Sequence, residues 1–175
     1  EVVASGVEAS MTIRFMITDR ARIGRTFGGK FGKLTYWIHR EGDITEPTSW
    51  RSVSAATFRQ RLVEAGASLP TVDDPINDHA RQPHLTLFVH GFNNSWTDAV
   101  GRYNNICQQM YDGPNGLGVC VLFSWPSDGA VTNYLPDRAE ADRCADDVAE
   151  VLSELYRYQT VMQHKAAKGG ATCGV

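Results

Sequence analysis

The run LTLFV, from Leu85 to Val89, ends abruptly at the pair His90-Gly91. The run is too short for a helix, is bracketed by Pro83 and Gly91, and does not alternate polar with apolar residues. This pattern is typical of a strand that is covered on both faces, as the strands of parallel sheets are. We therefore expect a strand over residues 85–89 in the middle of a sheet.

A helix and a second strand follow this run. After Thr97, apolar residues recur every three to four positions, as one face of a helix requires: Ala99 or Val100, Tyr103, Ile106 or Cys107, and Met110. Ser95 or Thr97 is a suitable N-cap for this helix. The run Val119–Phe123 then repeats the pattern of a buried strand. A strand, a helix and a strand at this spacing imply parallel strands joined by a right-handed crossover.

Ligands meet such sheets just beyond the carboxyl ends of the strands, so residues 90–94 and 124–129 are expected at the working edge. Gly91 permits a sharp backbone turn, after which amide groups can point into a cleft and bind an oxyanion. The alternative is an ordinary strand-to-helix turn, in which His90 is a buried side chain with satisfied hydrogen bonds and Asn93 and Asn94 cap the helix.

The N-terminal part of the chain favours a hairpin. Met11–Thr18 and Lys33–His39 have the composition of strands, and the glycine-rich segment Gly24–Gly32 lies between them. We expect residues 11–40 to form an antiparallel hairpin at the edge of the sheet.

Two further helices are predicted. Ser54–Ala65 is amphipathic, and the following segment, Gly66–Pro83, reads as a loop. After residue 136, a long helix would face the sheet with these apolar residues: Ala141, Ala145, Val148, Leu152 and Leu155. The chain is therefore expected to be of the α/β class, with a β-α-β-α core over residues 85–158.

Composition bounds the class of protein. The chain has 175 residues, of which 42% are hydrophobic, and this suits a single soluble domain over residues 1–175. No apolar stretch approaches the ~20 residues of a membrane span, and a net charge of −3 gives no general argument for nucleic acid. The first residues lack the features of a signal peptide, but the chain begins with Glu1, so the compartment stays open, with the cytoplasm favoured. We expect no cofactor and no metal site, because the five histidines form neither H-E-x-x-H nor any pair four residues apart.

Charge is unevenly distributed. Residues 11–40 hold seven basic side chains against one acid, and residues 137–154 hold seven acids against two arginines. Solvated faces of opposite sign are the favoured explanation, and a basic face for an anionic partner or substrate is the alternative.

Three motifs carry a family resemblance. The segment LTLFVHGFNNSWTDAVGRYNNI contains V-H-G-F-N-N, and VCVLFSWPSDGAVTNYLPDRAEADRCADDVAEVLSEL contains F-S-W-P-S followed by D-R-x-x-A. In this order the motifs resemble a branch of the α/β-hydrolase superfamily known as alpha/beta hydrolase of unknown function. The resemblance covers residues 85–158 well and residues 11–65 loosely. It implies an α/β-hydrolase-like, mostly parallel sheet with flanking helices and an N-terminal antiparallel hairpin.

The resemblance also implies roles for individual residues. The backbone N–H of Phe92 would supply part of an oxyanion hole, and His90 and Gly91 would shape it. The residues that would border the substrate are Asn93, Asn94, Trp125, Pro126 and Ser127.

One part of the family pattern is missing. An α/β-hydrolase needs a nucleophile elbow such as G-x-S-x-G, followed by an acid and a histidine. The nearest match, Trp125–Gly129, has tryptophan in place of the first glycine and precedes a predicted loop, which disfavours Ser127 as nucleophile. We therefore expect the sheet to be incomplete at its C-terminal side and the elbow strand to begin near Val175, so that the chain is the front half of a catalytic domain.

Two functions follow from this reading. The complete protein would be a serine hydrolase of esterase, lipase or thioesterase type acting on a small-molecule ester or acyl substrate, with these 175 residues inactive alone. The alternative is a non-catalytic interaction module on a hydrolase-like scaffold. Both leave an open sheet edge, expected beyond residues 119–123, to be covered by the missing C-terminal half or by a partner.

Overall fold

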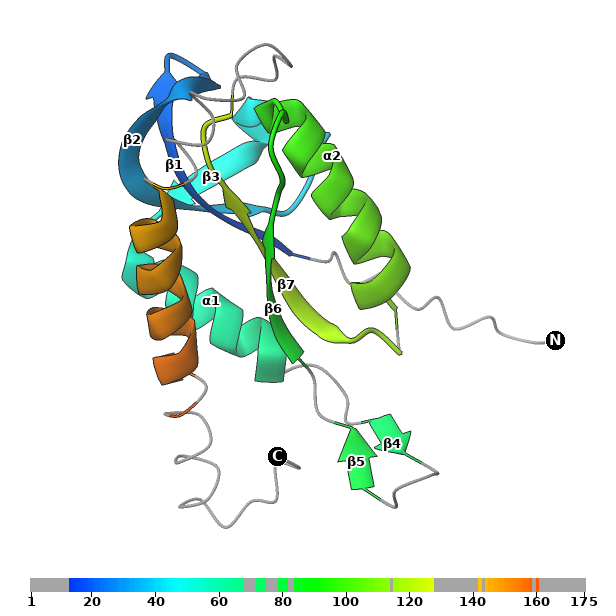
Figure 1. Cartoon of the computed structure of the whole chain (residues 1–175). Helices are drawn as coiled ribbons and strands as arrows, with labels where there is room; N and C mark the ends of the chain where they lie inside the picture. Colours follow the sequence, from blue (N-terminus) through cyan, green and yellow to red (C-terminus); the bar gives the residue numbers. More distant parts are fainter. Residues whose placement is uncertain are drawn as a thin grey trace, which may run out of the picture.

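The computed structural model describes residues 13–67, 72–74, 79–81, 84–113, 115–127, 142, 144–158 and 160. A five-stranded sheet with the order β3-β2-β1-β7-β6 forms its centre (Figure 1). The elements in chain order are β1 (Arg14–Ile23), β2 (Thr26–His39), η1 (Pro47–Ser49), β3 (Trp50–Val53), α1 (Ala55–Ala67), β4 (Val72–Asp74), β5 (His79–Arg81), β6 (His84–Val89), α2 (Trp96–Ile106), η2 (Cys107–Tyr111) and β7 (Gly118–Ser124). A last helix covers residues 144–158. The predicted α/β class is confirmed.

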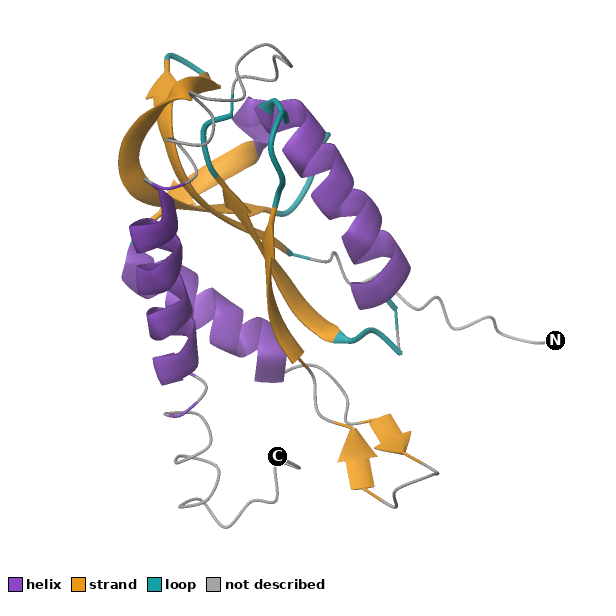
Figure 2. Cartoon of the chain, in the orientation of Figure 1, coloured by secondary structure: helices purple, strands orange, loops and turns teal. Residues whose placement is uncertain are grey.

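Helices cover both faces of the sheet (Figure 2). On one face α1 and the helix over residues 144–158 pack on the sheet, and the buried residues there include Phe15, Phe58, Leu62, Phe123, Val151 and Leu155. On the other face α2 packs on the sheet, and the buried residues include Met16, Trp37, Trp96, Val100, Tyr103 and Leu122. Alternation along β1 and β7 sends neighbouring side chains into opposite cores, which explains why the runs Phe15–Ile17 and Val119–Phe123 are apolar without a break.

The predicted strand–helix–strand unit is present. Strands β6 and β7 are parallel, with Val89 opposite Phe123, and α2 connects them. Ser95 is the N-cap of α2 and forms a capping box with Asp98, which confirms one of the two predicted caps. Met110, predicted on the apolar face, is 48% exposed. The last turn is a π-helix, and its wider repeat rotates Met110 away from the sheet.

The predicted position of the open edge is wrong. Strand β7 lies between β1 and β6, so both of its edges are paired, and β6 is the outermost strand. Leu85 and Val89 of β6 are accordingly 38% and 41% exposed. Among the described residues, no strand pairs with the outer side of β6. The apolar run of β6 has the pattern of an interior strand, but the strand that pairs on both sides is β7.

The antiparallel hairpin is confirmed, but its predicted place at the sheet edge is wrong. Strand β1 pairs with β7 in parallel and with β2 in antiparallel, and β3 occupies the edge. The glycine-rich connection is mostly strand, because the ladder continues to the turn at Gly24, whose φ is 61°. Sequence patterns missed β3, a four-residue strand.

The long helix packs on a different stripe from the one predicted. Cys144, Val151 and Leu155 are buried, whereas Leu152 is 50% exposed and Ala145 is exposed. The predicted and the observed apolar faces of this helix share Val148 and Leu155. The spacing of apolar residues alone therefore could not decide which of the two faces packs on the sheet. The segment predicted as a loop before β6 contains the short antiparallel pair β4 and β5.

Candidate functional site

The segments that follow β6 and β7 lie side by side. The indole Nε1–H of Trp125 donates to the carbonyl oxygen of His90 at 2.9 Å, and the backbone N–H of Trp125 donates to His90 Nε2 at 3.1 Å. The two rings are stacked, with centroids 5.4 Å apart and planes 1° from parallel. The two segments meet because β6 and β7 are parallel neighbours, so both strands end at the same edge of the sheet.

The hydrogen bonds of His90 fix the tautomer of its neutral ring. The ring is 2% exposed, and Nδ1 lies 2.9 Å from the carbonyl oxygen of Gly91. A carbonyl can only accept and the Trp125 amide can only donate, so the proton of the neutral ring is on Nδ1. Burial, with a further contribution from the positive charge of Arg20, lowers the pKa of His90 to about 4. His90 is therefore neutral near pH 7, and because its one lone pair already accepts a hydrogen bond, it acts by positioning the strand ends.

A buried arginine lies beneath the same loop. Arg20 is 3% exposed and donates from Nη2 to the carbonyl oxygen of Asn94 at 3.1 Å. Its Nε donates to Ser124 Oγ at 3.0 Å, and its Nη1 donates to the carbonyl oxygen of Gly28 at 3.3 Å. From the sequence, Arg20 was recognised only as one member of a basic run. Its position next to Asn94 could not be predicted, because that position depends on how β1 pairs with β7. The guanidinium places a fixed positive charge close to residues 90–94.

Asparagine side chains shape the turn. Asn94 is 3% exposed, and its Nδ2 donates to the carbonyl oxygens of Gly91 at 2.8 Å and Phe92 at 2.9 Å. The left-handed residue is Asn93, with φ 59°, and no such φ occurs at Gly91. The predicted use of Gly91 for the sharp turn is therefore wrong, because Asn93 adopts the left-handed conformation, which asparagine tolerates.

The predicted substrate-contacting residues differ in exposure. Trp125, Pro126 and Ser127 are buried, and Ser127 Oγ accepts the backbone N–H of Asn94 at 3.3 Å. Asn94 is also buried and Asn93 is half-buried, whereas Phe92, the predicted oxyanion donor, is 39% exposed. Trp125 and Ser127 thus hold the loop over residues 90–94 in place through hydrogen bonds to His90 and Asn94. The roles assigned to all these residues toward a substrate stay predictions.

The described residues include no cluster of three or more His, Cys, Asp or Glu side chains that could hold a metal ion. No helix in the described part of the chain is long and apolar enough to cross a membrane.

Comparison with known families supplies the identity. A family model described as alpha/beta hydrolase of unknown function (DUF900) matches residues 71–165, more than half of the 175 residues. The chain belongs to this family. The matched region includes β6, α2 and β7, and hence both strand ends of the candidate site, whereas β1, β2, β3 and α1 precede it. No curated protein and no solved structure matches the chain.

Proposed function

We propose that the complete protein is a serine hydrolase of esterase, lipase or thioesterase type, and that this chain contributes its oxyanion-binding strand end. The substrate would be a small-molecule ester or acyl compound. Membership of the alpha/beta hydrolase family supports the reaction class. The observation that carries the proposal is the loop over residues 90–94, which follows β6 and is held by two buried side chains, Arg20 of β1 and Trp125 just after β7.

In this proposal the backbone N–H of Phe92 stabilises the oxyanion of the tetrahedral intermediate. An oxyanion hole is effective when its donors are fixed before the reaction, because no reorganisation is then needed as charge develops. His90 and Asn94 supply that rigidity through their hydrogen bonds to the loop. The buried charge of Arg20 favours a negative charge developing nearby.

The nucleophile would come from a strand that pairs with β6. The outer side of β6 has no partner among the described residues, and Leu85 and Val89 are partly exposed there. A parallel strand in that place would end beside residues 90–92, because parallel strands bring their carboxyl ends to the same edge. A serine at its end, activated by a histidine and an acid that follow it in the chain, would then face the Phe92 N–H.

The second candidate is a non-catalytic module that binds a partner protein. The same open side of β6 favours it, since an exposed strand edge can accept a strand from another molecule. The two candidates differ in one respect: only the first needs an amide donor at Phe92.

The experiment uses the polypeptide extended past Val175 in its reading frame and measures hydrolysis of p-nitrophenyl esters. Phe92→Pro removes the backbone donor, and Phe92→Ala keeps it while removing the same ring. We expect Phe92→Pro to lower kcat by about 100-fold or more, the effect of losing one oxyanion donor, with a much smaller change for Phe92→Ala. Equal kcat values for the two variants would contradict the assigned role, and no hydrolysis by the wild type would favour the interaction module.

A further inference from the structure

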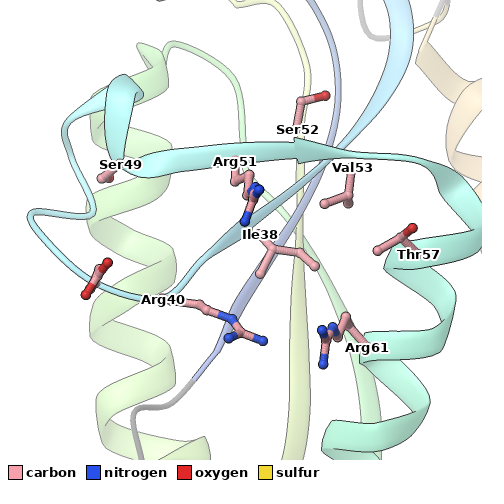
Figure 3. A pocket seen from close by; sticks show the side chains of 9 residues that line it. Ile38, Arg40, Ser49, Arg51, Ser52, Val53, Thr57 and Arg61 are labelled. Carbon is pink, nitrogen blue, oxygen red and sulfur yellow. The ribbon is translucent and has the colours of Figure 1, made fainter.

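A hollow of about 510 Å³ lies at the opposite edge of the sheet from the candidate site. It is formed where the edge strand β3 meets the end of β2 and one side of α1 (Figure 3). Three arginines from these three places point into one shared space: Arg40, Arg51 and Arg61. Ile38 and Val53 form its apolar floor, and Thr57 lines it from α1. Nothing in the proposed hydrolase function uses this hollow.

The register of the sheet explains why these side chains converge. Arg51 of β3 lies opposite Ile38 of β2, so the two share the face that α1 covers. Arg40 is two residues after Ile38 and continues that face where β2 has ended. On α1, Phe58 and Leu62 face the core, so Arg61, one position before Leu62, lies on the flank of the helix beside the hollow.

The hollow carries an excess of positive charge. Among the described residues, Arg40 and Arg51 make no ion pair, whereas Arg61 pairs with Glu64 at 2.9 Å. Glu64 also accepts a hydrogen bond from Gln60, and Glu41 is the one acid in the lining. Three guanidinium groups beside two carboxylates, Glu41 and Glu64, leave a net positive charge at the hollow, which a bound anion would offset.

The other basic side chains of residues 11–40 do not contribute. Arg14 is buried and pairs with Asp112, Arg20 lies beneath the candidate site, and Arg22 stacks on Trp37 with 4.5 Å from its Cζ to the ring. Arg25, Lys30 and Lys33 are exposed to solvent. Arg40 lines the hollow, and Arg51 and Arg61 join it from outside the run.

We propose that this arginine hollow binds a phosphate monoester. One planar guanidinium fork satisfies a carboxylate, whereas three guanidinium groups from three directions match the several oxygens and the double charge of a phosphate. The volume is that of a small-molecule site, so the phosphate would contact the arginines and the organic part would lie on Ile38 and Val53.

Binding is measured with inorganic phosphate and glycerol 3-phosphate, by calorimetry and by NMR of the arginine Nε–H groups, at constant ionic strength. Vesicles of phosphatidylcholine with and without phosphatidic acid form a separate arm, which distinguishes a lipid headgroup from a soluble ester. We expect glycerol 3-phosphate, or vesicles with phosphatidic acid, to bind and to shift the Nε–H signals of the three hollow arginines.

Three variants test the location. Arg40→Gln and Arg51→Gln each remove one exposed guanidinium and should weaken binding about tenfold or more, since each loses a charge-assisted hydrogen bond. Arg25→Gln removes an equal charge from the exposed turn between β1 and β2 and should leave affinity within about twofold. The proposal is overturned if no probe binds, or if all three variants weaken binding equally, which would indicate general attraction to a cationic surface.

Discussion

The neutral state of buried His90 makes the stability of the protein depend on pH. The pKa of His90 is lowered to about 4 in the folded protein, from an unfolded value of about 6.5. Between these values the unfolded chain binds a proton that the folded protein does not, so the free energy of unfolding falls as pH falls. A difference of about 2.5 pKa units corresponds to about 3 kcal/mol over the full range, and roughly 2 kcal/mol of this should be lost between about pH 7 and about pH 4.5.

The assay is urea unfolding followed by tryptophan fluorescence at these two pH values. His90→Gln cannot titrate, so the loss of stability between the two pH values should be smaller in this variant than in the wild type by roughly 2 kcal/mol. His84→Gln replaces an exposed histidine and controls for the substitution itself. Equal pH dependence in the wild type and His90→Gln would refute the claim that burial keeps the ring neutral.

Three further predictions concern Gly91 and Asn93 in the candidate site and Tyr103 in the core. Gly91→Ala should change the free energy of unfolding by less than about 1 kcal/mol, because the nearest atom to an added Cβ is 4.0 Å away, whereas Asn93→Val should cost about 1–2 kcal/mol at φ 59°. Tyr103 is fully buried, and its hydroxyl donates to the Cys120 carbonyl at 2.8 Å and accepts the Phe15 N–H at 3.1 Å. Tyr103→Phe should therefore cost about 2–3 kcal/mol in urea unfolding, since it strands two buried backbone groups. A loss for Gly91→Ala as large as that for Asn93→Val, or a neutral Tyr103→Phe, would contradict these assignments.

The sequence was informative where one local pattern determines one structure. Ser95 and Asp98 specify the start of α2 by themselves, because a capping box needs only contacts three residues apart. The parallel unit of β6, α2 and β7 followed from two apolar runs and one helical period. These features depend on few tertiary contacts, so a single sequence is enough to predict them.

The features that the sequence did not predict correctly depend on contacts between distant parts of the chain. Whether β6 or β7 is the interior strand is decided by the pairing of β1 with β7, and an apolar run does not encode its neighbours. The position of Arg20 beneath Asn94 follows from the same pairing, across 74 residues of sequence. The sharp turn expected at Gly91 involves Asn93 for a different reason: glycine and asparagine both tolerate the left-handed conformation, and the loop contains both.

We propose that this chain provides an oxyanion-binding strand end for a serine nucleophile located elsewhere in the complete protein. The most direct test of this proposal is fluorophosphonate labelling of the polypeptide extended past Val175, followed by mass spectrometry of the labelled peptide. We expect a single labelled serine in the segment after residue 175. Labelling at Ser127, or no labelling of an extended polypeptide that is folded, would contradict it.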